Sequence, residues 1–165
     1  MPGACSNGPS ACAATSVVVV EVHVGHVADI DPMTLYRILQ LRSAVFVVEQ
    51  NCAFADLDGR DLEQGVRQVW VSRNDQVPAT LRVLPDPAGW RIGRVVTARG
   101  ARSDGLGALL LERALALTEG ADVVLDAQAY LEPWYERFGF ARCGKPYLED
   151  GIEHVPMLRR AAQPP

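Results

Sequence analysis

The feature that most limits the fold lies between residues 90 and 127, where the sequence predicts a strand, a helix and another strand in succession. Residues 90–97 are strand-like, residues 107–118 are strong helix formers, and residues 123–127 form a short apolar run with β-branched members. Two strands joined through a helix are typically parallel neighbours. We therefore expect a sheet that is parallel at this point.

The preceding part of the chain predicts an antiparallel meander. Residues 20–24 alternate apolar and polar side chains, as a half-buried strand does. Asp31 and Pro32 are typical of a helix start, and an apolar stripe extends that helix over residues 32–48. Residues 68–73 and 77–84 predict two strands joined by a tight turn at Asn74 and Asp75, and the strand at residues 90–97 completes a meander of three.

The remaining segments are shorter. Residues 133–137 predict a short helix that ends at Gly139, and residues 140–143 and 154–159 predict the last two strands. Residues 51–65 are rich in acidic side chains and lack periodic apolar positions, which indicates a surface or functional loop.

Composition narrows the class of protein. The 165 residues carry 16 basic and 20 acidic side chains, and 48% are hydrophobic, as in one globular domain. We expect a disordered tail over residues 1–16, a domain over 17–160 and a short tail over 161–165. The net charge of −4 argues against nucleic-acid binding, and no apolar run is long enough to cross a membrane. Four cysteines without metal-ligand spacing predict no metal site and a reducing, cytoplasmic setting.

The bend between residues 97 and 107 carries the chemistry. Four arginines and no acid occupy residues 90–102, and Gly105 and Gly107 open the following helix. Glycine lets a ligand approach the backbone, and free amides at a helix start attract anions, so the bend predicts a phosphate site. The Gly-Lys-Ser/Thr of a nucleotide-hydrolysing loop is absent, and a dinucleotide fingerprint is only half matched, because Leu110 replaces its third glycine.

The pattern that does fit is Arg102-x-x-Gly105-x-Gly107, which resembles the signature of the GNAT superfamily of acyl-CoA-dependent N-acetyltransferases. The segment YLEPWYERFGF at residues 130–140 is similar to the superfamily's second conserved segment. Residues 41–50, 56–61, 125–128 and 149–157 resemble the ElaA-like branch. The resemblance implies an α/β (α+β) fold with a mostly antiparallel sheet of about six to seven strands. That sheet would be splayed between strands four and five and flanked by about four helices.

The resemblance also implies how acetyl-CoA would bind. Its pantetheine arm would lie in the splay against the fourth strand, and its diphosphate would meet amides at residues 102–108. The residues expected to bind this co-substrate are Val95, Val96, Thr97, Arg102, Ser103, Asp104, Gly105, Leu106, Gly107, Ala108, Gln128 and Tyr135. Gln128 and Ala129 stand where many members have asparagine, so the contact from that side is open.

The implied reaction is direct attack of a primary amine on the thioester. An amine of pKa about 10.4 must first lose a proton, and the leaving thiol, of pKa about 8.5, must gain one. Tyr135 matches the tyrosine that protonates the thiolate, while Glu49 and His154 are candidates for the base or for an ammonium contact. Asp58 and Asp61 could also attract a cationic amine, although a solvated acidic loop is their ordinary interpretation.

Other readings stay open at this stage. The chain could be a non-catalytic acyl-CoA-binding or regulatory module of the same fold, or a nucleotide-dependent oxidoreductase that responds to NAD. Cysteine catalysis through Cys52 or Cys143 has no supporting histidine or basic context, and His23 and His26 are expected to be structural. The acceptor would be a small-molecule or peptide amine. The apolar residues 155–158 suggest a possible homodimer.

Overall fold

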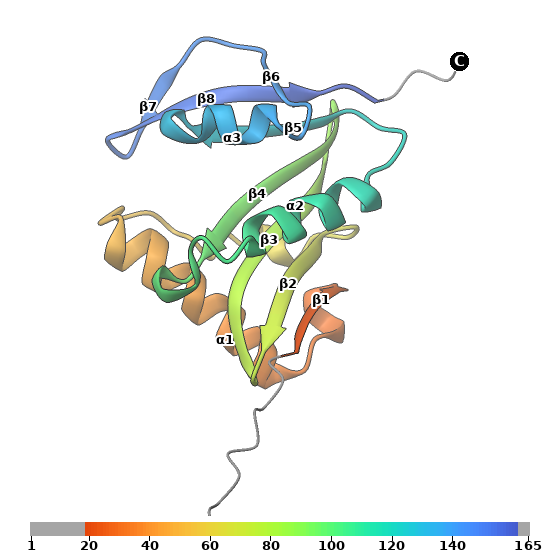
Figure 1. The fold of residues 1–165 in the computed structure, drawn as a ribbon, viewed down its shortest axis with the longest axis vertical. Coiled ribbons are helices and arrows are strands. Elements are labelled where there is room, and N and C mark those ends of the chain that lie inside the picture. Colours follow the sequence, from red (N-terminus) through yellow and green to blue (C-terminus); the bar gives the residue numbers. More distant parts are fainter. Residues whose placement is uncertain (1–18, 162–165) are drawn as a thin grey trace, which may run out of the picture.

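Residues 19–161 are described by a computed structural model (Figure 1), in which eight strands form one sheet in the order β1-β2-β3-β4-β5-β8-β6, with β7 also paired to β8. The strands are β1 Val20–Gly25, β2 Arg67–Arg73, β3 Gln76–Asp86, β4 Gly89–Thr97, β5 Val123–Gln128, β6 Ala141–Arg142, β7 Tyr147–Glu149 and β8 Ile152–Arg159. The α-helices are α1 Pro32–Arg42, α2 Leu106–Leu117 and α3 Glu132–Glu136. The parallel pair is β4 with β5, and the other strand pairs are antiparallel, so the predicted fold class is confirmed.

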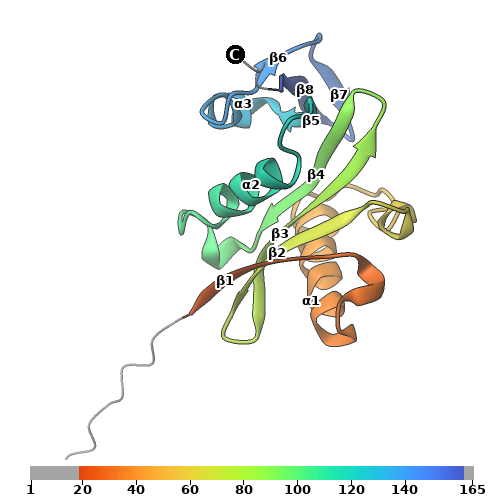
Figure 2. The same cartoon turned by 90° about the vertical axis from the view of Figure 1, so that its right-hand side faces the viewer.

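The helices lie on both faces of the sheet. In Figure 2, α1 lies on one side of β2, β3 and β4, while α2 and α3 lie on the other. The main apolar core is enclosed between the sheet and α2, where Leu110, Leu111 and Ala114 meet buried side chains such as Leu81 and Val123. The face under α1 has a much smaller apolar cluster. No helix in this part of the chain is long and apolar enough to span a membrane.

Several local signals act as the sequence predicts. Oδ1 of Asp31 accepts hydrogen bonds from the amides of Met33 and Thr34, both at 3.1 Å, which caps α1. Asn74 and Asp75 adopt positive φ angles of 49° and 58° and form the tight turn between β2 and β3. His26 caps the short 3-10 turn at residues 27–29, so its expected structural role is confirmed.

Other features differ from the expectation. The helical stripe changes at Ser43, because residues 43–49 form a wider π-helical turn in which the amide of Gln50 bonds the carbonyl of Val45. Within residues 19–161, three α-helices flank the sheet instead of about four, and β7 was not expected. Strand β8 lies between β5 and the pair β6 and β7, so Val155 and Met157 are buried within the monomer. The apolar residues that suggested a homodimer are therefore explained without one. The expected tail over residues 1–16 lies outside the described residues, as do residues 162–165 of the tail expected over 161–165.

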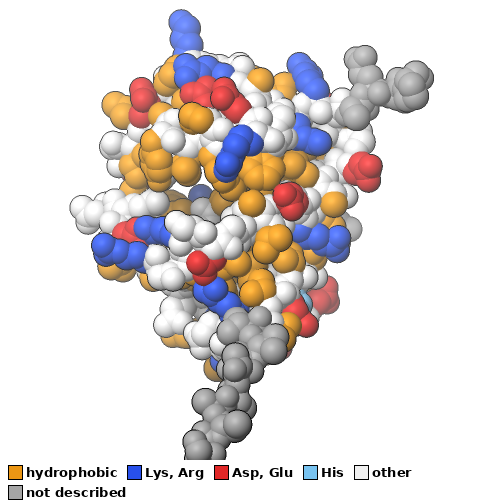
Figure 3. Space-filling view, viewed as in Figure 1, with side chains coloured by type: hydrophobic (Ala, Val, Ile, Leu, Met, Phe, Trp, Pro, Cys, Tyr) orange, Lys and Arg blue, Asp and Glu red, His pale blue; other side chains and the backbone are white. Residues whose placement is uncertain are grey.

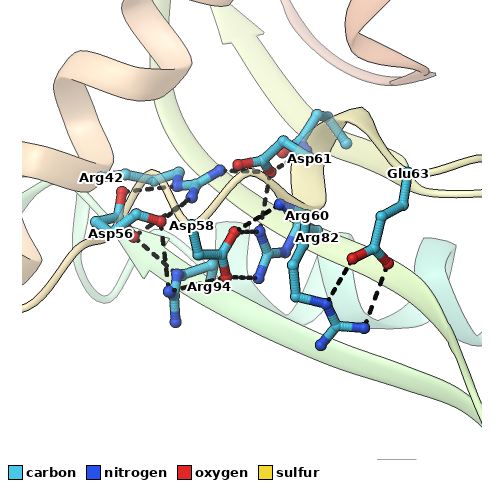
Figure 4. A network of polar contacts seen from close by, with 9 residues as sticks. Arg42, Asp56, Asp58, Arg60, Asp61, Glu63, Arg82 and Arg94 are labelled. Carbon is cyan, nitrogen blue, oxygen red and sulfur yellow. Dashed lines mark hydrogen bonds and ion pairs between the residues drawn. The ribbon is translucent and has the colours of Figure 1, made fainter.

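A network of buried charges joins α1 and the loop at residues 51–62 to the sheet (Figure 4). Arg42 is fully buried; its Nε donates to Asp56 at 3.0 Å and its Nη1 donates to Asp61 at 2.8 Å. Arg82 of β3 makes two hydrogen bonds to Asp58, of 2.7 and 2.8 Å. The loop is therefore attached to the sheet through its carboxylates.

This attachment corrects the prediction of a solvated acidic loop. Asp56 and Asp61 are buried, and all three aspartates are paired with arginines. The periodic pattern of α1 already contained Arg42 among apolar residues, but pattern alone could not show that its partners come from a later segment. A buried arginine needs such partners, because an unpaired charge in the interior is very costly.

Removal of one buried partner should therefore be costly. We predict that Asp61→Asn lowers the free energy of unfolding by about 3 kcal/mol or more, because Arg42 and Arg82 lose a shared carboxylate. Urea denaturation at neutral pH measures this loss. The matched control is Glu63→Gln in the same loop, which breaks an exposed pair with Arg60 and should cost less than about 1 kcal/mol. Equal losses for the two variants would contradict the role assigned to the network.

The same network predicts how stability depends on pH. Hydrogen bonds from Arg82 hold the pKa of Asp58 at about 2, below its ordinary value of 3.8. A carboxylate with a lowered pKa stabilises the folded state above its unfolded pKa, and this contribution disappears as pH falls through the folded pKa. The stability difference between the wild type and Asp58→Asn should therefore shrink as pH falls from about 4 to about 2. Urea midpoints measured across this range test it, and a constant difference would refute it.

Candidate active site

Strands β4 and β5 pair over a short stretch and then separate. The pairing joins Trp90 to Val123 and Arg91 to Val124, although β4 continues to Thr97 and β5 to Gln128. Beyond Arg91, the edge of β4 that faces β5 has no strand partner among the described residues. Main-chain groups on that edge are consequently available to a ligand, and the splay expected between strands four and five is confirmed.

A bulge in β4 lies at the start of this gap. In the register with β3, Gly93 pairs with Arg82 and Val96 with Thr80, so two residues of β4 face Leu81 alone. Arg94, inside the bulge, has a φ of +53°. This conformation is unfavourable for a side chain other than glycine and costs on the order of 1–3 kcal/mol, so surrounding contacts must hold it.

The gap opens into a cavity of about 370 Å³. Its walls include Ile92, Gly93, Arg94 and Val95 from β4 and Leu125, Asp126 and Gln128 from β5. Phe46, Phe54, Tyr135, Tyr147 and His154 complete much of the lining. In Figure 3 the surface is also hollowed between the part that carries α3 and the start of α2. The volume lies within the range of small-molecule sites.

Tyr135 of α3 forms part of the cavity wall. Its side chain is 5% exposed, and its ring packs edge to face against Trp134 at 4.7 Å and Phe140 at 6.0 Å. Burial, with a smaller contribution from Tyr130, raises the pKa of Tyr135 well above its ordinary value. The hydroxyl thus keeps its proton at neutral pH and can act as a donor.

The start of α2 has the features of an anion site. Gly105 caps the helix with a φ of +78°, which suits glycine, and no side chain caps the amides. The amides of Gly105, Leu106 and Gly107 have no acceptor within residues 19–161. A Cβ on Gly107 would lie 3.7 Å from the indole of Trp134, which places the helix start beside α3. Free amides at a helix start can bind a diphosphate.

Three of the four arginines near this bend are already paired with carboxylates, which corrects an expectation from sequence. Arg91 pairs with Asp86 and Asp126, Arg94 with Asp56 and Asp58, and Arg102 with Glu49. Of the four, Arg99 has no ion pair with any described residue. Asp104 also forms an ion pair, because Nη1 of Arg73 lies 2.6 Å from its Oδ2. The bend therefore offers amides more than guanidinium groups.

The other predicted residues fall in two places. His154 lines the cavity and stacks on Tyr147, with ring centroids 5.9 Å apart. Glu49 does not line the cavity. Its Oε1 lies 2.7 Å from Nη2 of Arg102. The Nε of Arg102 also donates to the carbonyl of Thr97. Gln128 also lines the cavity, and its Nε2 donates to Oε1 of Gln50 at 3.3 Å. The structure brings Tyr135, His154 and Gln128 together, and leaves Glu49 at the edge.

Sequence reasoning missed several residues at the site. The sequence gives Trp134 no role beyond its place in the motif at residues 130–140, yet its ring contacts Tyr135 and approaches Gly107. Phe54 and Gln50 line the cavity from the loop after α1, and Tyr147 lines it from the unexpected β7. The motif itself was the available signal for Trp134. Gln50 ends the ElaA-like segment at residues 41–50, whereas Phe54 and Tyr147 are brought to the cavity by long-range packing, for which the chain carries no local signal.

Comparison with known proteins supports the assignment of the fold and family. Residues 44–160 match the family model described as "Acetyltransferase (GNAT) domain". A UPF0039 protein of Mycobacterium tuberculosis is 47% identical over 136 residues, which cover 79% of this chain and 87% of that protein. Protein ElaA of Escherichia coli is 37% identical over 145 residues, which cover 84% of this chain and 95% of ElaA.

Solved structures agree with these matches. The crystal structure of an acyl-CoA N-acyltransferase from Pseudomonas aeruginosa gives a TM-score of 0.80 with 42% identity, and the match covers 84% of this chain and 99% of that chain. The crystal structure of Escherichia coli ElaA gives a TM-score of 0.79 with 36% identity, and covers 86% of this chain and 100% of that chain. The splayed sheet, the free helix start and these matches agree: the chain belongs to the GNAT family of acyl-CoA-dependent acyltransferases, in its ElaA-like branch.

Proposed function

We propose that this chain is an N-acetyltransferase that moves the acetyl group of acetyl-CoA to a primary amine by direct attack on the thioester. The observation that carries the proposal is the gap between β4 and β5. It holds a cavity with Tyr135 in its wall, and it lies beside a helix start with unpaired amides. This arrangement provides binding groups for a long thioester carrier and a proton donor for its leaving group.

The main chain would hold the co-substrate. The unpaired edge of β4 at Val95, Val96 and Thr97 would accept and donate hydrogen bonds to the amides of the pantetheine arm. Amides within residues 102–108, at the start of α2, would bind the diphosphate. An amide of β4 that is not used by β3 would also stabilise the negative charge that develops on the thioester oxygen.

Tyr135 would protonate the departing thiolate. Its raised pKa keeps the phenol neutral at working pH, so a proton is available when the carbon–sulfur bond breaks. The aromatic contacts with Trp134 and Phe140 fix the orientation of the ring. The proton moves from the tyrosine oxygen to the sulfur, and the amide product forms without a covalent enzyme intermediate.

His154 is better placed than Glu49 to remove a proton from the amine. Nδ1 of His154 lies 3.0 Å from the carbonyl of Ile152. A carbonyl oxygen only accepts hydrogen bonds, so Nδ1 carries the proton and Nε2 of the neutral ring is an acceptor. The carboxylate of Glu49 is paired with Arg102 outside the cavity lining. We therefore assign the base to His154 and a structural pairing to Glu49.

The acceptor in this proposal is a primary amine with positive charge, from a small molecule or a peptide. The four arginines that line the cavity all have carboxylate partners. Glu149 and Asp150 also line it and have no ion pair with any described residue. The uncompensated charge at the cavity is thus negative, and it would attract an ammonium group.

The free thiols of Cys52 and Cys143 support a cytoplasmic setting.

Binding of acetyl-CoA can be tested by thermal denaturation. We predict that acetyl-CoA raises the melting temperature progressively with concentration, by an amount equivalent to about 2.7 kcal/mol at a hundred times the dissociation constant. Acetyl-pantetheine, which lacks the diphosphate, should stabilise much less, because the amides at the start of α2 then have no anion. NAD should have no effect. A response to NAD without a response to acetyl-CoA would contradict the proposal.

Catalysis can be tested separately through Tyr135. We predict that Tyr135→Phe lowers kcat by about a hundredfold or more, because the proton donor is lost. KM for acetyl-CoA should change little, since phenylalanine preserves the ring packing. Release of free CoA thiol with a panel of amines measures both constants, and Tyr36→Phe on the exposed face of α1 is the control. Tight acetyl-CoA binding without turnover for any amine would instead indicate a non-catalytic binding module.

A further inference from the structure

Among the described residues, Arg94 is the one non-glycine residue that has a positive φ inside a strand. Outside glycine, positive φ angles also occur at Asn74, Asp75 and Asp150 in tight turns, and at Asn51 and Ser103 in loops. Arg94 instead lies in the middle of β4, where the register with β3 shifts. The preceding residue is Gly93, and glycine would adopt a positive φ without strain. The positive φ nevertheless falls on the arginine. The side chain of Arg94 must therefore contribute something that glycine would not.

The guanidinium of Arg94 is held on several sides by the loop at residues 51–62. Its Nε lies 2.7 Å from Oδ1 of Asp56, and its Nη2 lies 3.4 Å from both the Asp56 carbonyl and Oδ2 of Asp58. Its Cζ lies 4.9 Å from the centre of the Phe54 ring. These contacts bring charge, hydrogen bonding and a cation–π interaction to one side chain. They connect the bulge of β4 to the loop.

The partners of Arg94 are themselves fixed. Asp56 also binds the fully buried Arg42 of α1, at 3.0 Å from its Nε, and Asp58 binds both terminal nitrogens of Arg82. Arg82 faces Gly93 in the register of β3 with β4. The loop is therefore held by α1 on one side and by β3 on the other, and it can act as a rigid support for the bulge (Figure 4).

We infer that Arg94, through its ion pair with Asp56, is a positioning residue that sets the bulge of β4 and so the main-chain groups that face the thioester. The inference rests on the proposed function, because it concerns the same gap between β4 and β5. Arg94 would act through the backbone of Gly93 and Val95, which line the cavity beside it. Because its contacts are with the loop at residues 51–62, the diphosphate contacts proposed at the start of α2 would be kept, and we expect a larger effect on kcat than on KM for acetyl-CoA.

Kinetics of two variants test this. Arg94→Gly accepts the positive φ without strain but removes the guanidinium, and we expect kcat to fall by about tenfold or more while KM for acetyl-CoA changes less than about threefold. Arg94→Lys keeps the charge without the planar fork and should recover part of kcat. Arg142→Gln, which breaks an exposed pair with Glu132 outside the cavity, is the control for loss of an ion pair. A kcat for Arg94→Gly within about twofold of wild type would overturn the inference.

Hydrogen–deuterium exchange tests the bulge without any activity. In the free protein, Arg94→Gly should speed exchange of peptides that cover β4 and leave peptides that cover α2 unchanged, because the contacts that the variant loses are with the loop at residues 51–62 and not with α2. Unchanged exchange in β4 would overturn the inference, whatever the kinetics. If the wild type binds no acetyl-CoA and releases no thiol, the proposed function fails, and this exchange experiment still decides whether Arg94 holds the strand. If Arg94→Gly does not fold, Arg94→Lys should show the same effect to a smaller degree.

Discussion

The separation of β4 from β5 after their second paired residue is the constraint on which the rest of the structure depends. A sheet that opens in its middle leaves main-chain groups without partners, and such groups are costly unless water or a ligand satisfies them. Packed elements frame the opening on both sides. Strands β1 to β4 lie between α2 and the charged network under α1, and β8 pairs with β5, β6 and β7. One apolar core, which includes Ile92 of β4, Leu110 of α2 and Val123 of β5, joins the two parts of the sheet.

The charged network explains how the face under α1 can be stable with so small an apolar cluster. Arg42, Arg82 and Arg94 each meet carboxylates from one loop, so that these three arginines and three aspartates of the loop compensate one another at close range. Removing these charged groups from water costs free energy, and their pairing compensates for this cost only when the ion-pair distances and angles are kept. The network therefore fixes the position of the loop. It also fixes the position of the bulge that the loop contacts.

Local chemistry was sufficient to predict much of the fold. Asp31 before Pro32 predicted the start of α1, and Asn74 with Asp75 predicted a turn, because each depends only on neighbouring backbone. The resemblance of the bend at residues 102–107 to a known signature predicted the splay. Pairings between distant residues could not be predicted in this way. The four arginines of residues 90–102 suggested an anion site, yet three of them neutralise carboxylates from other segments, as Arg94 does with Asp56.

The opening in the sheet can be reached from both faces, so the proposed reaction does not need a covalent enzyme intermediate. The start of α2 and Trp134 lie on the face that α2 and α3 cover, whereas Phe54 and Asp58 reach the cavity from the loop that follows α1 on the opposite face. A carrier bound from one face and an amine bound from the other would meet within the gap. Cys52 lies in the cavity wall, but its thiol is buried and donates to the carbonyl of Gln50, so no activated nucleophile competes with the amine. In the proposed reaction the amine would therefore attack the thioester directly, and the strained bulge of β4 would lie where the two substrates meet.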